Sequence, residues 1–165
     1  MEIRRAQPED AQGVRRVAEA SWHTAYDEIL GEETIDTMLD EWYEVESIKS
    51  GIERDVAPMF VCIDDGTIVG FAQGVASDEP HADSLLSRIY VHPDEWGGGY
   101  GSRLLEELFD ELSQAGHEDI WLTVLKENEV GRQFYEKHGF ERIEEQTTQI
   151  GDQAAEELIL VADLK

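Results

Sequence analysis

Apolar residues recur along this chain with two spacings, one typical of helices and one typical of strands. Apolar positions three and four residues apart predict helices near residues 8–18, 32–39, 44–55, 99–116 and 129–138. Dense or alternating apolar runs predict strands near residues 2–6, 59–63, 67–76, 85–91, 120–125, 140–150 and 156–164. This order of elements predicts a mixed sheet flanked by helices, of the mixed α/β (α+β) class.

Local signals mark where several of these elements begin and end. Pro8 is suited to the first turn of a helix, and Gly116 is suited to cap the C-terminus of the fourth helix. The Asp-Gly pair at 65–66 separates two apolar runs, which is a strong hairpin signal. Residues 22–30 are expected to lie between the first two helices. Because no repeat, low-complexity tract or linker interrupts the pattern, residues 1–165 are expected to form a single domain.

The charge balance excludes one class of partner. Asp and Glu number 38 against 13 Lys and Arg, which gives a formal net charge of −25. Nucleic acid is not expected as a partner, because phosphate backbones need a basic face. No apolar run approaches the roughly 20 residues that span a bilayer, so no membrane association is expected. The N-terminus lacks the apolar core of a signal peptide, which favours a cytoplasmic location.

The acid excess itself has two explanations. It could attract a cationic substrate, or it could keep the protein solvated at very high salt, where the Debye length near 1 M is only ~3 Å. We favour the second, a halophilic-type acidic protein, because the acids are spread along the whole chain and lysine is scarce. The single cysteine, Cys62, excludes an internal disulfide, and its apolar surroundings favour a buried thiol.

A glycine-rich turn between a predicted strand and a predicted helix carries the clearest chemical signal. Four glycines, Gly97, Gly98, Gly99 and Gly101, fall within five residues. Such a turn offers free backbone N–H groups at the positive end of a helix, which is a site for phosphate. The turn matches neither a Walker loop, which needs Gly-Lys-Ser/Thr, nor the GxGxxG dinucleotide fingerprint.

Two segments resemble the GNAT superfamily of acetyl-CoA-dependent N-acetyltransferases. The first resembles the family's pyrophosphate loop, Gln/Arg-x-x-Gly-x-Gly/Ala, and comprises residues 89–93, 96–101 and 104–105. The second resembles the family's second acyl-CoA motif and comprises Asn128, Gly131 and residues 134–140. The resemblance covers about residues 2–163. It implies a central mixed, mostly antiparallel sheet of six to seven strands flanked by about four or five helices.

The chain departs from the family pattern at two positions. Trp96 stands where the family usually has Gln or Arg, and Leu85 stands where many members have a glutamate. Backbone amides carry most of the phosphate binding in the family, and Trp96 does not remove them. The departures keep open the alternative of a catalytically silent acyl-CoA-binding or sensing domain.

The resemblance also implies which residues contact acetyl-CoA, the co-substrate. These are Ile89, Tyr90, Val91, Trp96, Gly97, Gly98, Gly99, Tyr100, Gly101, Ser102, Asn128, Arg132 and Tyr135. The strand residues would offer backbone groups to the pantetheine arm. Asn128 could instead cap the helix that follows it, or do both. Arg132 could reach the 3′-phosphate, although a solvated surface arginine is the favoured interpretation.

Acetyl transfer to an amine needs an acid, an oxyanion donor and a base. By resemblance, Tyr135 is the general acid that protonates the departing thiolate; the alternative is a core aromatic. The backbone N–H of Ile89 or Val91 could stabilise the oxyanion. The sequence does not identify the base; the candidates are Asp83, His81, Glu79, Tyr26 and His23.

The predicted reaction is direct transfer of the acetyl group of acetyl-CoA to a primary amine in a ternary complex. The acceptor would be a small molecule or the N-terminus of a protein or peptide, and Trp22 and Tyr26 would line its pocket by resemblance to the family. The histidines show no metal-ligand spacing, so no metal is expected. A monomer or a homodimer is expected, with the final strand, residues 156–164, as the natural edge for a dimer.

Overall fold

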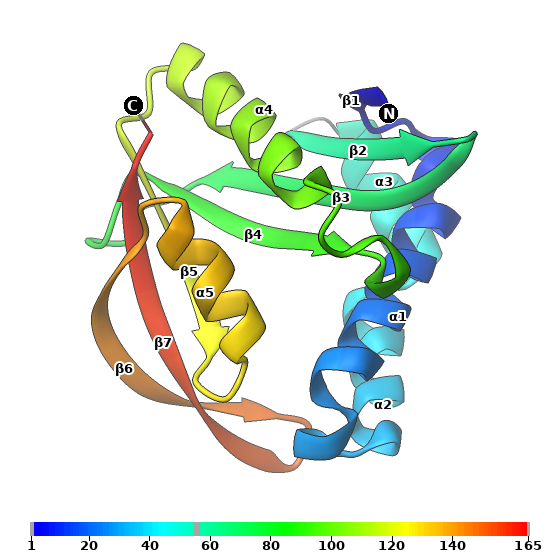
Figure 1. Ribbon diagram of the computed structural model, residues 1–165, viewed down its shortest axis with the longest axis vertical. Helices are drawn as coiled ribbons and strands as arrows, with labels where there is room; N and C mark the ends of the chain where they lie inside the picture. The colour runs from blue at the N-terminus through cyan, green and yellow to red at the C-terminus, as the bar shows by residue number, and fades with distance from the viewer. Residues whose placement is uncertain (1, 55–56, 165) are drawn as a thin grey trace.

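The computed structural model describes residues 2–54 and 57–164 and contains a seven-stranded sheet with helices on both faces (Figure 1). The strands are β1 (Glu2–Arg5), β2 (Met59–Asp64), β3 (Thr67–Ala76), β4 (Ser84–Val91), β5 (Asp119–Leu125), β6 (Glu141–Ile150) and β7 (Gln153–Asp163). The α-helices are α1 (Ala11–Leu30), α2 (Glu32–Trp42), α3 (Val45–Arg54), α4 (Tyr100–Gln114) and α5 (Glu129–Lys137). Short 3₁₀ turns, Pro8–Asp10 and Pro93–Glu95, precede α1 and α4.

The sheet is mixed and mostly antiparallel, which confirms the predicted fold. Its strand order is β1-β2-β3-β4-β5-β7-β6, and β4 with β5 is its parallel pair. The prediction that the final strand forms an edge is wrong. β7 pairs with β5 on one side and with β6 on the other, so β6 is the edge strand. The β6–β7 hairpin folds back, and its second strand inserts next to β5.

The parallel pair holds the two halves of the sheet together at one end only. The Cα register between β4 and β5 comprises a single pair, Leu85 with Trp121, at the start of β4. Beyond it the strands diverge, so β2–β4 run across the view in Figure 1 whereas β6 and β7 run down it. The later residues of β4 therefore face a gap instead of a neighbouring strand.

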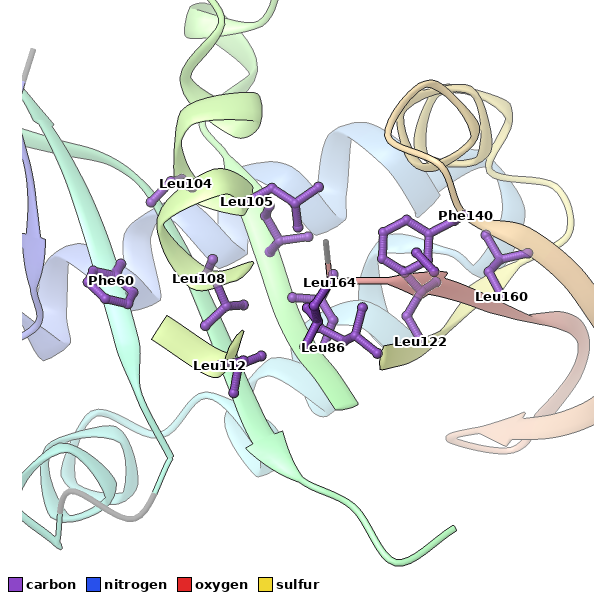
Figure 2. Close-up of a cluster of buried hydrophobic side chains, with 14 of the residues drawn as sticks. Phe60, Leu86, Leu104, Leu105, Leu108, Leu112, Leu122, Phe140, Leu160 and Leu164 are labelled. Atoms are coloured by element: carbon purple, nitrogen blue, oxygen red, sulfur yellow. The ribbon is translucent and has the colours of Figure 1, made fainter. Parts of the chain in front are cut away.

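Two apolar clusters cover the two faces of the sheet. One lies under α4 and α5 and is built on α4 from Leu104, Leu105, Leu108 and Leu112 (Figure 2). The other lies under α1, α2 and α3 and includes Phe71. α1 and α4 each bury an apolar stripe against the sheet, as their sequence spacing predicts, whereas α2 packs against α1.

Helix α1 extends further than the sequence pattern predicted. Residues 22–30, expected between helices, continue α1 as far as Leu30. Trp22, Tyr26 and Leu30 recur four residues apart and are buried on one face of the helix. The helix ends at Gly31, which has a φ of +89°, a conformation that glycine adopts readily.

The remaining boundaries agree with the pattern to within a few residues. Gly116 has a φ of +99° just after α4, as expected of a helix C-cap. Asp55, where the third helix was expected to end, lies outside the described residues. In the part of the chain that the structure describes, no helix has the length and apolar character needed to cross a bilayer.

Candidate active site

A cavity of about 610 Å³ lies where β4 and β5 diverge. That volume falls in the usual range for small-molecule sites. Four segments contribute its walls: the middle of α1, the end of β4 with the glycine turn, the loop after β5, and α5. The lining residues that the sequence also singled out are Tyr26, Ile89, Tyr90, Val91, Trp96, Gly97, Gly99, Tyr100, Gly101, Ser102, Asn128 and Tyr135.

The glycine turn presents the N-terminus of α4 to this cavity. Gly99 is the N-cap residue and has a φ of +82°, and Gly97 has a φ of +88°. Both values are costly for other residues. The N–H groups of Tyr100, Gly101 and Ser102 lie in the first helical turn, where the helix itself provides no acceptor. The turn can therefore donate several hydrogen bonds to an anion.

Gly101 also allows α4 and α5 to approach closely. A Cβ at this position would lie 3.1 Å from Cε1 of Phe134, which is tighter than ordinary contact. The aromatic ring of Phe134 thus packs directly against the backbone of the glycine turn. This contact fixes the distance between the anion-binding turn and the helix that carries Tyr135.

The open edge of β4 presents backbone groups to the cavity. The N–H of His92 donates to Val69 of β3, and Tyr90 pairs with Phe71. Because N–H groups alternate between the two sides of a strand, those of Ile89 and Val91 point away from β3 and toward the gap. An extended chain that contains amides could pair with this edge.

Trp96 and Ser21 both donate to one carbonyl on that edge. The indole Nε1–H of Trp96 lies 2.8 Å from the carbonyl oxygen of Val91, and the hydroxyl of buried Ser21 lies 3.1 Å from the same oxygen. Both lone pairs of this oxygen are therefore used within the chain. Where the family usually has a polar side chain, this chain has Trp96, whose hydrogen bond to Val91 links the glycine turn to β4. Ser21 was missed by sequence reasoning, because its segment was not expected to be helical.

Asn128 connects α5 to α1 across the cavity. Its side-chain oxygen accepts a hydrogen bond from the Gly131 N–H at 2.9 Å and so caps α5. Its side-chain Nδ2 donates to the Tyr26 hydroxyl at 2.8 Å. Gly131 leaves room for this arrangement, since a Cβ there would lie 2.5 Å from Nδ2. The predicted cap is present, and the amide makes a second contact that was not predicted.

Four tyrosines line this cavity, Tyr26, Tyr90, Tyr100 and Tyr135, and each has a pKa above its usual value, so all stay protonated at neutral pH. Burial raises the pKa of Tyr26 to about 12, although the hydrogen bond from Asn128 opposes the rise. Burial also raises the pKa of Tyr135 well above its usual value. Because its phenol stays protonated, Tyr26 is unsuited to act as a general base.

The structure does not bring the other base candidates to this cavity. Asp83 accepts hydrogen bonds from the backbone N–H groups of Glu118 and Asp119. Burial raises the pKa of this carboxyl, but the hydrogen bonds outweigh burial, so the pKa lies below its usual value. The ring of His81 packs edge-on against Trp121, 4.9 Å between centroids. Both side chains link the loop before β4 to the start of β5, at the end where the two strands are paired. Neither candidate lies in the cavity lining.

Several other predicted residues also lie outside the lining. His23 bridges α1 and α2 through Asp27 and Asp36. Trp22 is 8% exposed and packs behind Tyr26, 4.6 Å between ring centroids. Three other predicted residues also lie outside the cavity lining: Glu79, Gly98 and Arg132. Arg132 lies one turn into α5, 4.0 Å from Glu129, as a surface ion pair.

Comparison with known proteins assigns the chain. The model of the acetyltransferase (GNAT) family matches residues 16–140, which is most of the chain and includes the glycine turn, Asn128 and Tyr135. The chain belongs to the GNAT family. It is accordingly an N-acetyltransferase, and the resemblance seen in its two motifs is confirmed.

Individual relatives agree with this assignment. A spermidine N(1)-acetyltransferase of Thermoplasma acidophilum is 29% identical over 145 residues, covering 85% of this chain and 88% of the relative. The crystal structure of a PaiA N-acetyltransferase from the same organism, in complex with coenzyme A, has a TM-score of 0.84 at 26% identity and covers 98% of both chains. A ribosomal-protein-alanine N-acetyltransferase of Brucella melitensis shares the fold, with a TM-score of 0.78 at 21% identity over 99% of both chains.

Proposed function

We propose that this GNAT enzyme binds acetyl-CoA and a primary amine together and transfers the acetyl group directly between them. The observation that carries the proposal is a convergence in one cavity. The N-terminus of α4, the open edge of β4 and the hydroxyl-bearing residue Tyr135 all contribute to its walls. An anion site, an amide-pairing edge and a proton donor are what a thioester with a diphosphate tail requires.

The residues fit acetyl-CoA in two ways. First, the glycine turn forms a cradle of N–H donors with space for a diphosphate, and Gly97 and Gly99 adopt the conformation that the cradle needs. Second, the N–H groups of Ile89 and Val91 face the gap with no neighbouring strand. We propose that the turn holds the pyrophosphate and that this edge pairs with the amides of the pantetheine arm. A structural relative in complex with coenzyme A supports the assignment.

The proposed chemistry gives each remaining group one task. Acetyl transfer joins the amine nitrogen to the thioester carbonyl carbon and breaks the carbon–sulfur bond. Tyr135 gives its phenolic proton to the departing sulfur, and the proton lost by the amine returns to the phenol through solvent. The N–H group of Ile89, the one farther from the glycine turn, is the proposed donor to the carbonyl oxygen as it gains charge, which leaves the N–H group of Val91 to the pantetheine arm.

We propose that the acceptor is a small cationic amine, such as a polyamine. An alkyl ammonium has a pKa of about 10.4, so it arrives with a positive charge and must lose a proton before attack. Three carboxylates, Glu95, Glu127 and Glu129, belong to the cavity lining, against one basic side chain, Lys137, among the described residues. Glu127 lies in the turn between β5 and Asn128, and we assign it to attract the amine and receive its proton through water. The name of the spermidine-acetylating relative supports this substrate class.

Thiol release with a panel of amines tests the function. Wild-type protein is expected to release CoA in the presence of polyamines, and Tyr135→Phe is expected to lower kcat about 10²- to 10⁴-fold, the usual contribution of a general acid. Tyr43→Phe is the matched control, because Tyr43 is a buried tyrosine outside the cavity lining. Binding of CoA with no turnover of any amine would favour the silent binding domain instead. Unchanged kcat in Tyr135→Phe would remove the assigned role of Tyr135.

We also propose that the acidity of the chain is an adaptation to high salt. Acids outnumber bases by 38 to 13, and their repulsion is screened over ~3 Å at about 1 M salt. The melting temperature is therefore expected to rise between dilute buffer and molar potassium chloride. A higher melting temperature in dilute buffer would contradict the adaptation.

A further inference from the structure

One contact in the anion-binding turn involves a histidine that the proposed chemistry does not use. The hydroxyl oxygen of Ser102 lies 2.9 Å from Nε2 of His138. Ser102 belongs to the cavity lining in the first turn of α4, whereas His138 follows the last turn of α5. The hydrogen bond therefore joins the turn to the far end of the helix that carries Tyr135.

Packing holds this pair in register. The ring of Phe134 contacts the backbone at Gly101, and its centroid lies 4.7 Å from that of His138. His138 is partly buried beside this ring. The distance between Ser102 and His138 is thus set by the contact between two helices, and not by a flexible surface side chain.

The chemistry of the pair depends on which partner donates. A serine hydroxyl has one proton to donate. If that proton goes to Nε2, none remains for a ligand in the cavity. If Nε2 carries a proton and donates to Oγ, the hydroxyl proton of Ser102 is free to point into the cavity. A phosphate only accepts hydrogen bonds, so it selects the second arrangement.

We propose that His138 is a positioning residue for the CoA diphosphate. In the complex His138 is the imidazolium: its Nε2–H donates to Ser102, and Ser102 in turn donates to a phosphate oxygen beside the N–H groups of the glycine turn. This inference rests on the proposed function, since it assumes that the diphosphate lies in that turn. His138 itself need not touch the ligand.

The proposal implies proton uptake on binding. Without ligand, burial lowers the pKa of His138 below its ordinary value, the charge of Lys137 lowers it further, and Glu106 on α4 opposes the shift. A bound diphosphate adds negative charge and favours the imidazolium. His138 then has a higher pKa in the complex than in the free protein. CoA binding is therefore strengthened below the free pKa, and this gain is lost as the pH rises through the pKa of the complex.

Calorimetric titration of the protein with CoA, in two buffers of different ionisation enthalpy, measures the proton uptake. A rise of about one pKa unit on binding gives at most about 0.5 proton and about a tenfold gain in affinity at low pH. Wild-type protein is expected to show both. His138→Gln is expected to lose the uptake and this pH dependence, because an amide can donate to Ser102 but does not titrate. Protons bound by CoA itself cancel in the difference between the two proteins.

Two further variants separate the pair from its surroundings. Ser102→Ala is expected to take up fewer protons than the wild type, because the hydrogen-bonded link to the phosphate is gone and only the charge of the diphosphate still acts on His138. His117→Gln, the same substitution at the opposite end of α4, is expected to keep the wild-type uptake. Equal uptake in wild type and His138→Gln, or full uptake in Ser102→Ala, overturns the inference alone. A wild-type protein that does not bind CoA overturns the proposed function, and the inference with it.

Discussion

Replacing Asn128 with alanine is expected to destabilise the protein by about 2 kcal/mol. The side-chain oxygen caps α5 through the Gly131 N–H at 2.9 Å, and loss of such a cap costs about 1 kcal/mol. The side-chain nitrogen donates to Tyr26 at 2.8 Å, and loss of one hydrogen bond of this kind costs about 1 kcal/mol more. For a chain of this length, each kcal/mol lowers the melting temperature by about 2–4 °C.

The aspartate variant isolates the cause. In Asn128→Asp, one carboxylate oxygen still accepts from the Gly131 N–H, and the other can accept the phenolic proton of Tyr26. A negative charge at a helix N-terminus adds about 0.3–1 kcal/mol of stability. The stability of this variant is therefore expected to stay near that of the wild type.

Urea unfolding at constant, molar salt measures the free energies of unfolding of the alanine and aspartate variants. A double-mutant cycle of Asn128→Ala with Tyr26→Phe is expected to give a coupling free energy of about 1 kcal/mol, the value of the lost hydrogen bond. Two results would refute the reasoning. One is a loss below about 0.5 kcal/mol in Asn128→Ala, which is under the smallest usual cost of a lost cap. The other is an equal loss in the alanine and aspartate variants.

Two further outcomes follow from contacts elsewhere. Trp96→Phe keeps an aromatic ring but removes the hydrogen bond to the Val91 carbonyl. The Kd for CoA should therefore rise about fivefold, the equivalent of about 1 kcal/mol. Titration calorimetry measures this Kd, and an unchanged value would contradict the role of the indole. Asp10, which is 6% exposed, has a lowered pKa, because hydrogen bonds from Arg4 and the Gln7 N–H outweigh the effect of burial. Its contribution is present above the unfolded pKa of about 3.9 and is lost as the pH falls through the lower folded value. The free energy of unfolding of Asp10→Asn should therefore converge on that of the wild type in acid. A constant difference down to pH 2 would contradict the stabilising role of the Asp10 carboxylate.

The fold was predictable as far as local spacing determines it. The strands and helices appear where apolar residues recur with the matching period, and the turn at 65–66 joins β2 to β3 as expected. The position of β7 was not predictable in this way, because the pairing order of strands depends on contacts distant in sequence. A hairpin alone does not say which of its strands will insert beside β5. The end of α1 was missed because aromatic residues such as Trp22 and Tyr26 are weaker helix formers than alanine or leucine.

The candidate site was predictable where backbone geometry carries the chemistry. Glycines at 97–101 indicated an anion site from residue type alone, and Asn128 indicated a helix cap. The base candidates failed for a different reason. Asp83 and His81 are close in sequence to β4, but they lie where β4 and β5 are paired, and the cavity opens at the other end of β4. His138 was missed because its partner, Ser102, is 36 residues away in the chain.

The single pairing between β4 and β5 makes the sheet incomplete until something lies in the gap. Any extended molecule that pairs with Val91 would serve as a temporary eighth strand, so its binding free energy would add directly to the stability of the folded state. The backbone amides of Ile89 and Val91 should exchange with deuterium quickly in the free protein and slowly when the gap is filled. Ligand binding and completion of the sheet then occur together. Release of product would have to break the same hydrogen bonds that complete the fold.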